Sequence, residues 1–316
     1  MRTTRRSTAA AALALGAIAV LGAACSSSSS SSSTTAPAPT TTATTSPLPT
    51  TVIPTQPTDP TVAVKVPAAV QSKGTLLVAT DATYPPMEMF AADGTTIVGV
   101  DADLSKALVQ TMGLTPKVEN ATFDTIIPGL DSGKYGMGAS SFTDTKARQQ
   151  KVDFVDYFSA GEAFYVKSGG GVSLSGLDSL CGHSVAVEAG TTEETDAKAQ
   201  AALCAKKGTG KVTVLTFNNQ SQANLAVSSG RADAGFADSQ VAGYIVASSK
   251  GVFQLSGSPF NLAPYGLALP KGNGMAPAVR AAMEAIVKNG TYDQILTKWG
   301  VIAGALNTPV INGATQ

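Results

Sequence analysis

The chain has 316 residues with 22 basic and 22 acidic side chains, and nearly all of this charge lies beyond residue 70. Residues 71–316 carry 18 basic and 21 acidic side chains without a basic cluster, which argues against a nucleic-acid partner. One histidine and three cysteines are too few for a closed zinc site of the usual kind, so we expect neither a metal nor a cofactor.

The first 24 residues have the order of features found in a secretory signal peptide. Three arginines at positions 2, 5 and 6 precede an apolar run over 9–21, and the small residues 22–24 follow. The run is shorter than the ~20 residues that a membrane-spanning helix needs, so an uncleaved membrane anchor is the weaker alternative. We therefore expect residues 1–24 to direct export and to be removed.

Cys25 follows this segment directly. The small residues before it resemble the lipobox of bacterial lipoproteins, in which the cysteine is acylated and becomes the new N-terminus. Gly22 stands where that motif usually has leucine, and Leu21 lies one place earlier. Two acyl chains are what stable membrane anchoring requires. The resemblance implies an exported protein held by lipid on the outer face of the bacterial cytoplasmic membrane.

Residues 25–70 are rich in serine, threonine, proline and alanine, and their only charges are Asp59 and Lys65. This composition offers too little apolar surface to offset the entropy lost on ordering. We predict a disordered tether there. The remaining 246 residues exceed the common size of a single core and favour two lobes or one large α/β unit.

Beyond residue 71, short β-rich runs alternate with helical patterns, which is typical of α/β folds. A first series consists of strand 75–79, helix 101–112, a strand around 118, helix 123–130 and strand 135–139. A second series consists of strand 184–187, helix 191–206, strand 212–215, helix 222–229, strand 234–236 and helix 239–248. An extended run over 265–269 and helices over 276–288 and 291–299 follow.

Cys181 and Cys204 flank the first strand and helix of the second series. An exported protein folds in an oxidising compartment, and an acylated Cys25 leaves these two as one pair. We predict a disulfide between them.

Seven short motifs follow one another along the folded part of the chain. They are GTLLVATDATYPPME (74–88), VGVDADL (98–104), FDTIIPGL (123–130), SSFT (140–143) with ARQQ (147–150), EAGTTE (188–193), GRADA (230–234) with Asp238, and GTY (290–292). Their order and spacing resemble the solute-binding proteins of bacterial amino-acid ABC importers, of the histidine, lysine/arginine/ornithine and glutamine-binding type. The resemblance covers nearly all of residues 73–300.

This resemblance implies an α/β, two-lobed periplasmic-binding-protein-like fold with two extended crossovers. The crossovers fall near 162–166 and 265–269. One lobe is then discontinuous, comprising 71–163 and 267–304, and the other is continuous over 164–266. Residues 305–316 form a C-terminal tail.

A free amino acid carries a carboxylate and an ammonium group, and burial of either charge requires a partner. Arg148 can grip the carboxylate with two parallel hydrogen bonds. Without the resemblance, an exposed helical arginine is the favoured interpretation of this residue. The resemblance, which also places Ser140, Ser141 and Thr143 at the site, favours binding.

Thr191 and Thr192 follow Gly190 at the start of a predicted helix. Backbone N–H groups and the helix dipole at such a terminus can hold the same carboxylate. The alternative is a simple N-cap.

The resemblance assigns the other parts of the ligand as well. Asp238 matches the acid that takes the ammonium group, and Tyr84 and Phe123 match rings that flank the ligand. Asp81 matches the residue at the distal polar end. Without the resemblance these residues are a helix cap, two core aromatics and a structural acid. Asp81, together with Glu193, favours glutamine or a basic amino acid over glutamate.

We therefore expect a monomeric, non-enzymatic protein that captures a free polar amino acid outside the cell and delivers it to the permease subunits of an ABC importer. An enzyme is the alternative, because cyclohexadienyl dehydratases share this fold. In that case Glu193 would be the general acid that protonates a leaving hydroxyl.

Overall fold

The computed structural model describes residues 48–314. Its strands are β1 (Thr75–Thr80), β2 (Thr83–Tyr84), β3 (Glu88–Phe90), β4 (Ile97–Val98), β5 (Thr115–Asn120), β6 (Met137–Gly138), β7 (Val152–Lys167), β8 (Ser184–Glu188), β9 (Thr213–Phe217), β10 (Ala234–Asp238) and β11 (Phe253–Pro270). Its α-helices are α1 (Pro60–Ala63), α2 (Ala68–Gln71), α3 (Val100–Thr111), α4 (Phe123–Asp131), α5 (Lys146–Gln149), α6 (Thr192–Lys207), α7 (Gln220–Ser228), α8 (Ser239–Ser248), α9 (Ala276–Lys288) and α10 (Thr291–Lys298).

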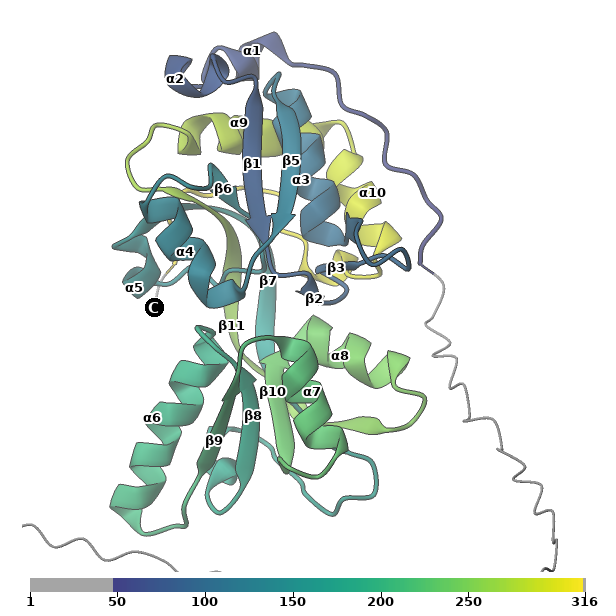
Figure 1. Cartoon of the computed structure of the whole chain (residues 1–316), viewed down its shortest axis with the longest axis vertical. Coiled ribbons are helices and arrows are strands. Elements are labelled where there is room, and N and C mark those ends of the chain that lie inside the picture. The colour runs from purple at the N-terminus through teal and green to yellow at the C-terminus, as the bar shows by residue number, and fades with distance from the viewer. Residues whose placement is uncertain (1–47, 315–316) are drawn as a thin grey trace, which may run out of the picture. The chain divides into compact units, whose positions relative to one another are not determined.

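One mixed sheet connects the two series of elements, with strand order β5-β1-β6-β11-β7-β10-β8-β9. The strands β1, β5 and β6 are parallel to one another at one end, and β8, β9 and β10 are parallel at the other. We call the elements on the β5-β1-β6 side the first lobe and those on the β10-β8-β9 side the second lobe. Figure 1 shows the long strands β7 and β11 running between them. The predicted α/β, two-lobed fold is therefore confirmed.

The crossovers are longer than the sequence patterns indicate. The predicted runs 162–166 and 265–269 lie inside β7 and β11, which have 16 and 18 residues. The two strands pair antiparallel from Phe253↔Lys167 to Pro270↔Val152, with register shifts near Ser256, Phe260 and Tyr265. Hydrogen bonding to a partner far along the chain extends each strand beyond its locally β-rich core.

Local signals set the helix ends well. The side chain of Thr191 caps α6 by accepting a hydrogen bond from the backbone of Glu194 at 3.1 Å, and Gly208 ends the helix with φ 69°. Acidic residues occupy its first turn and lysines its last, as the helix dipole favours. Helix α9 has the predicted bounds, 276–288.

The second lobe has an apolar core of its own, which includes Phe164, Phe236 and Cys204. Cys204 near the end of α6 is bonded to Cys181, which lies just before β8, and their Cα atoms are 5.6 Å apart. The predicted disulfide is confirmed.

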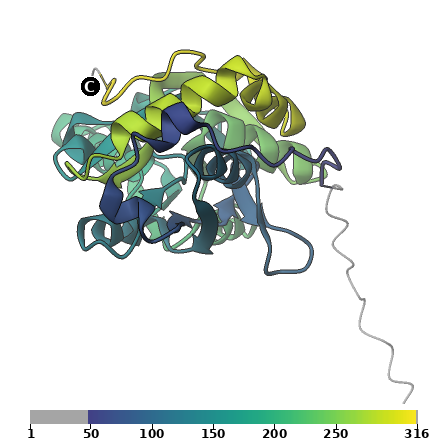
Figure 2. The same cartoon turned by 90° about the horizontal axis from the view of Figure 1, so that it is seen from above.

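Residues 48–70 differ from the expected disordered tether. Val62 and Val66 are buried against the first lobe, and Asp59 caps the short helix α1. The side-chain oxygen of Gln56 accepts hydrogen bonds from Asn289 and Thr291. Figure 2 shows the purple N-terminal segment beside the yellow C-terminal helices. We call residues 48–66 the N-terminal strap. The few apolar residues of the strap are ordered by packing against the first lobe, and the composition of the segment does not indicate such packing.

The signal peptide, Cys25 and the first part of the tether lie outside the described residues. None of the helices within 48–314 is long and apolar enough to cross a membrane.

Candidate functional site

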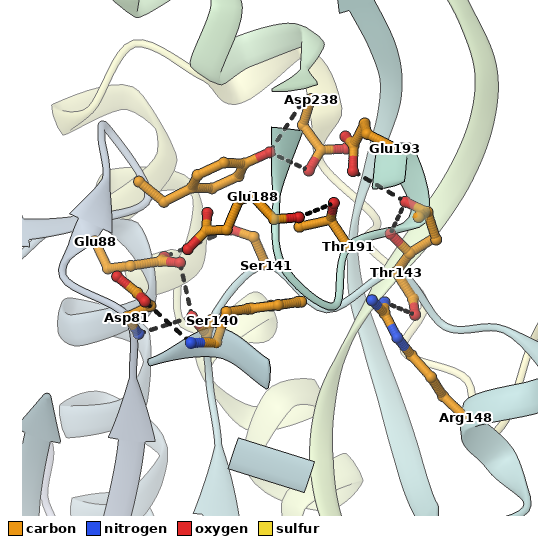
Figure 3. A pocket seen from close by; sticks show the side chains of 13 residues that line it. Asp81, Glu88, Ser140, Ser141, Thr143, Arg148, Glu188, Thr191, Glu193 and Asp238 are labelled. Carbon is orange, nitrogen blue, oxygen red and sulfur yellow. Dashed lines mark hydrogen bonds between the residues drawn. The ribbon is translucent and has the colours of Figure 1, made fainter. Parts of the chain in front are cut away.

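A narrow pocket lies where the two lobes meet, and all ten predicted ligand-binding residues line it. The first lobe contributes Asp81, Tyr84, Phe123, Ser140, Ser141, Thr143 and Arg148, and the second contributes Thr191, Thr192 and Asp238. Three carboxylates that were not assigned as ligand-binding residues, Glu88, Glu188 and Glu193, line it too. Most of these residues lie at the carboxyl ends of parallel strands, where α/β folds form ligand sites. Figure 3 shows them converging.

Arg148 is held at one side of the pocket by backbone oxygens from both lobes. Its Nη1 donates to the carbonyl of Thr143 at 2.8 Å and its Nη2 to that of Gly190 at 3.0 Å. The guanidinium lies 5.4 Å from the centroid of the Phe123 ring. Burial lowers the pKa of Arg148, and the charges of Glu193 and Asp238 oppose that shift. The guanidinium is therefore a preoriented cation that can donate hydrogen bonds to a carboxylate.

Thr191 and Thr192 begin α6 opposite this arginine. The hydroxyl of Thr191 donates to the carbonyl of Glu188 at 2.8 Å while it caps the helix, so the N-cap interpretation holds as well. The hydroxyl oxygens of Thr192 and Thr143 lie 3.4 Å apart and connect the two lobes. The helix terminus and Arg148 thus present hydrogen-bond donors from both lobes.

Tyr84 and Asp238 form a second connection between the lobes. The Tyr84 hydroxyl donates to Asp238 Oδ2 at 2.8 Å and accepts from the Asp238 backbone N–H at 2.9 Å. Burial raises the pKa of Asp238 to about 6, although hydrogen bonds from Tyr265 and Tyr84 and the charge of Arg148 lower it. The Asp238 side chain does not cap α8, so the helix-cap alternative is not its role here.

The far end of the pocket holds Asp81, Glu88 and Ser140. Asp81 accepts hydrogen bonds from the backbone of Phe123 at 3.0 Å and the hydroxyl of Thr83 at 2.7 Å. The Ser140 hydroxyl donates to Glu88 Oε1 at 3.0 Å and accepts from the Asp81 backbone N–H at 2.9 Å. Burial raises the pKa of Asp81, and burial together with Asp101 raises that of Glu88.

Ser141 continues this end of the pocket in a left-handed backbone conformation with φ 50°. That conformation is uncommon for residues other than glycine. It is held by a hydrogen bond from the Ser141 backbone N–H to Asp101 Oδ2 at 2.7 Å. The turn directs the Ser140 side chain toward Glu88.

Two further carboxylates keep a buried oxygen without a partner. Within residues 48–314, Glu188 Oε1 and Glu193 Oε1 accept no hydrogen bond. Burial raises the pKa of both groups, reinforced at Glu188 by Asp81 and at Glu193 by Asp238. Glu188 thus belongs to the far end of the pocket and Glu193 to the end near Asp238. Each end lacks a hydrogen-bond donor.

Residues 76–302 match the family described as bacterial extracellular solute-binding proteins, family 3. The chain belongs to this family. Its relatives include an arginine-binding protein of Corynebacterium glutamicum, 32% identical over 79% of this chain and 82% of the relative. Another is a glutamine-binding ABC-transporter protein of Bacillus subtilis, 32% identical over 64% and 72% of the two chains.

Solved structures give the same fold. An ancestral arginine-binding protein bound to arginine is 38% identical with a TM-score of 0.66, covering 72% of this chain and 98% of its own. An ancestral amino-acid-binding protein, a precursor of cyclohexadienyl dehydratase, is 34% identical with a TM-score of 0.64, covering 73% and 97%.

The sequence patterns did not assign a binding role to Glu88 or Glu188, although each lies in one of the seven motifs. Glu188 directly follows the predicted strand 184–187 and is the last residue of β8, so it lies at the carboxyl end of a parallel strand. That position could have indicated a binding role. Glu88 carries no such local signal, because its burial depends on Ser140 and Asp101 from other elements.

Proposed function

We propose that the protein captures a free basic amino acid, with L-arginine as the expected ligand, and delivers it to the membrane subunits of an ABC importer. The observation that carries the proposal is the charge of the pocket. Among its lining residues within 48–314, five carboxylates face the single basic side chain of Arg148. A ligand with two cationic groups and one carboxylate complements this set, whereas a glutamine leaves the far carboxylates uncompensated.

The two ends of the pocket fit the two ends of arginine. Arg148 and the start of α6 take the ligand carboxylate, and Asp238 with Glu193 takes the ammonium group. Asp81 and Glu188 then receive the guanidinium, whose planar fork suits paired carboxylates better than the point charge of lysine. Tyr84 and Phe123 flank the aliphatic stem. The arginine-binding relatives support this assignment.

Binding and lobe closure form one event in this proposal. Arg148 and Asp81 belong to the first lobe and Asp238 and Glu193 to the second, so the ligand is fully held only when both lobes contact it. We propose that the discontinuous lobe comprises 71–163 with 267–304 and the other 164–266. Lipid attachment at Cys25 would keep the protein beside its transporter.

A thermal-shift and calorimetry panel of the twenty amino acids tests the proposal. We expect L-arginine to bind most tightly, followed by lysine, then glutamine, with glutamate weakest. Tighter binding of glutamine than arginine would contradict the assignment.

The buried carboxyl of Glu193, with its raised pKa, keeps the dehydratase alternative in view. Incubating the protein with a cyclohexadienyl amino acid and measuring aromatic product distinguishes the two functions. We expect no product.

A further inference from the structure

We propose that Asp144 is a positioning residue for the carboxylate-binding side of the pocket, and that the C-terminal segment, residues 305–314, holds it in place. This segment lies beyond residues 76–302, which match the family. The inference rests on the proposed function, because it concerns how the same pocket grips its ligand.

The C-terminal segment covers an edge of the connecting strand β7. The half of β7 in the first lobe pairs with β11 on one side, and the segment lies along its other side. An uncovered strand edge would present unpaired N–H and C=O groups. The contacts are the bridges Val155↔Ile311 and Phe158↔Ala305, Asp156 N–H to Val310 O at 2.8 Å, Asn312 N–H to Phe154 O at 3.1 Å, and Phe154 N–H to Asn312 Oδ1 at 2.8 Å.

The end of the segment reaches Asp144, whose side chain is buried at 2% exposure. The backbone N–H of Ala314 donates to Asp144 Oδ2 at 3.0 Å. The other carboxylate oxygen accepts from the side chain of Gln149 at 2.8 Å, and the Asp144 backbone N–H donates to the carbonyl of Pro264. The Asp144 carboxylate therefore joins the C-terminal segment to α5. The backbone N–H of the same residue joins it to β11.

Asp144 directly follows Thr143, whose carbonyl accepts the hydrogen bond from Arg148 Nη1. Arg148 itself lies on α5, next to Gln149. The carboxylate thus fixes the spacing between the carbonyl that orients the guanidinium and the helix that carries it. Two parallel bonds to a ligand carboxylate depend on that placement, because small misplacements are costly.

The fit around this link is close. Asp156, with 3% exposure, interacts with the side chain of Asp144, and a Cβ atom at Gly313 would come within 2.3 Å of Asp156 Oδ2. The backbone of the segment therefore approaches the two acids directly. Proline at position 314 lacks this N–H group, and its ring carbon takes the place of the hydrogen that points at Asp144.

The test compares full-length Ala314→Pro with Ala314→Gly, which keeps the N–H group, and with Asp144→Asn. We expect Ala314→Pro and Asp144→Asn each to bind L-arginine about tenfold more weakly, the scale of one lost hydrogen bond to a buried charge. Ala314→Gly should stay within about twofold. The double variant Ala314→Pro/Asp144→Asn should bind like either single variant, because both changes remove the same link.

Calorimetry gives the affinity, and thermal unfolding shows how much of each variant is folded. A purely structural role would lower the melting temperature and leave the affinity of the folded protein unchanged, and that result would overturn the proposal. If the wild type binds a different amino acid of the panel, the comparison is made with that one.

A second readout needs no ligand. Amide hydrogen exchange at Arg148 and Gln149 should accelerate in Ala314→Pro and not in Ala314→Gly. Equal exchange in the two variants contradicts the proposal whatever the wild type binds.

Discussion

At the residue scale, the pocket is defined by charge that its own side chains do not balance. Glu188 and Glu193 are 2% and 1% exposed, and one oxygen of each has no partner within the described part of the chain. A buried polar group without a hydrogen bond costs stability, and a buried charge without a partner costs more. A cationic ligand removes both costs, which is why selectivity should depend on these two residues.

Glu188→Gln tests that dependence. We expect binding of L-arginine to weaken at least about tenfold while glutamine binding is retained, because the substitution removes one partner of a buried charge pair and keeps its shape. Calorimetry with both ligands measures the ratio. Glu284→Gln is the matched control, since Glu284 pairs with Arg280 on the surface. An unchanged arginine-to-glutamine ratio in Glu188→Gln would place the guanidinium elsewhere.

The pair Asp144 and Asp156 gives stability a dependence on pH. Burial and the nearby charge of Asp144 raise the pKa of Asp156 to about 7. Between about pH 4 and 7 the folded protein therefore keeps a proton that the unfolded chain has lost, and the free energy of unfolding falls as pH rises. Asp156→Asn removes this titration. The melting temperature of Asp156→Asn, measured relative to that of the wild type, should rise between pH 4 and pH 8.

Asp153, on the same strand, supplies a control of opposite sign. Burial raises its pKa, but hydrogen bonds from Lys271, Gly272 and Asn312 outweigh burial and lower it overall. Its contribution is present above the unfolded pKa and is lost as pH falls. Asp153→Asn should therefore lose most stability at neutral pH and least in acid. Parallel pH curves for the two variants would contradict both assignments.

Most of the pocket could be predicted because its residues belong to motifs that the sequence displays in order. Asp81, Arg148 and Asp238 were found by resemblance, although each alone has an ordinary structural interpretation. The place of Glu188 at the end of a strand was a local signal, but its carboxylate could be assigned to the pocket only once Asp81, from the other lobe, was known to lie beside it. Pairings between distant segments have no local pattern.

At the element scale, the N-terminal strap is the largest difference between expectation and structure. Gln56 is 8% exposed, and its backbone N–H donates to the side chain of Gln110 at 3.0 Å. Helix bounds followed from caps and apolar spacing, as α9 illustrates. The strap lacks such spacing, and its order depends on the surface offered by α3, α9 and α10.

Gln56→Ala measures how much this segment contributes. Removal of the side chain leaves the donors of Asn289 and Thr291 without their acceptor, so we expect a loss of about 1–3 kcal/mol in the free energy of unfolding. Gln71→Ala, at an exposed position in α2, should change it by less than about 0.5 kcal/mol. Urea unfolding compares the two. Equal stabilities would mean that the strap rests on the lobe without supporting it.

At the scale of the whole molecule, we propose two separable parts, an anchor at Cys25 and a binding unit whose described core begins at the strap. Cys25→Ser should release the protein from membranes without changing its thermal unfolding, because position 25 precedes the described residues 48–314 in the chain. Fractionation of cells that express the variant measures this. Continued membrane association would identify residues 9–21 as an uncleaved anchor.

The strap also determines where mechanical load enters the binding unit. Its contacts with Gln110, Asn289 and Thr291 all lie on the first lobe. Tension along the N-terminal chain should therefore enter at the first lobe, and force spectroscopy with arginine present would detect any weakening of capture. With Cys25 anchored as proposed, a pull along the chain would reach the second lobe only by way of the first.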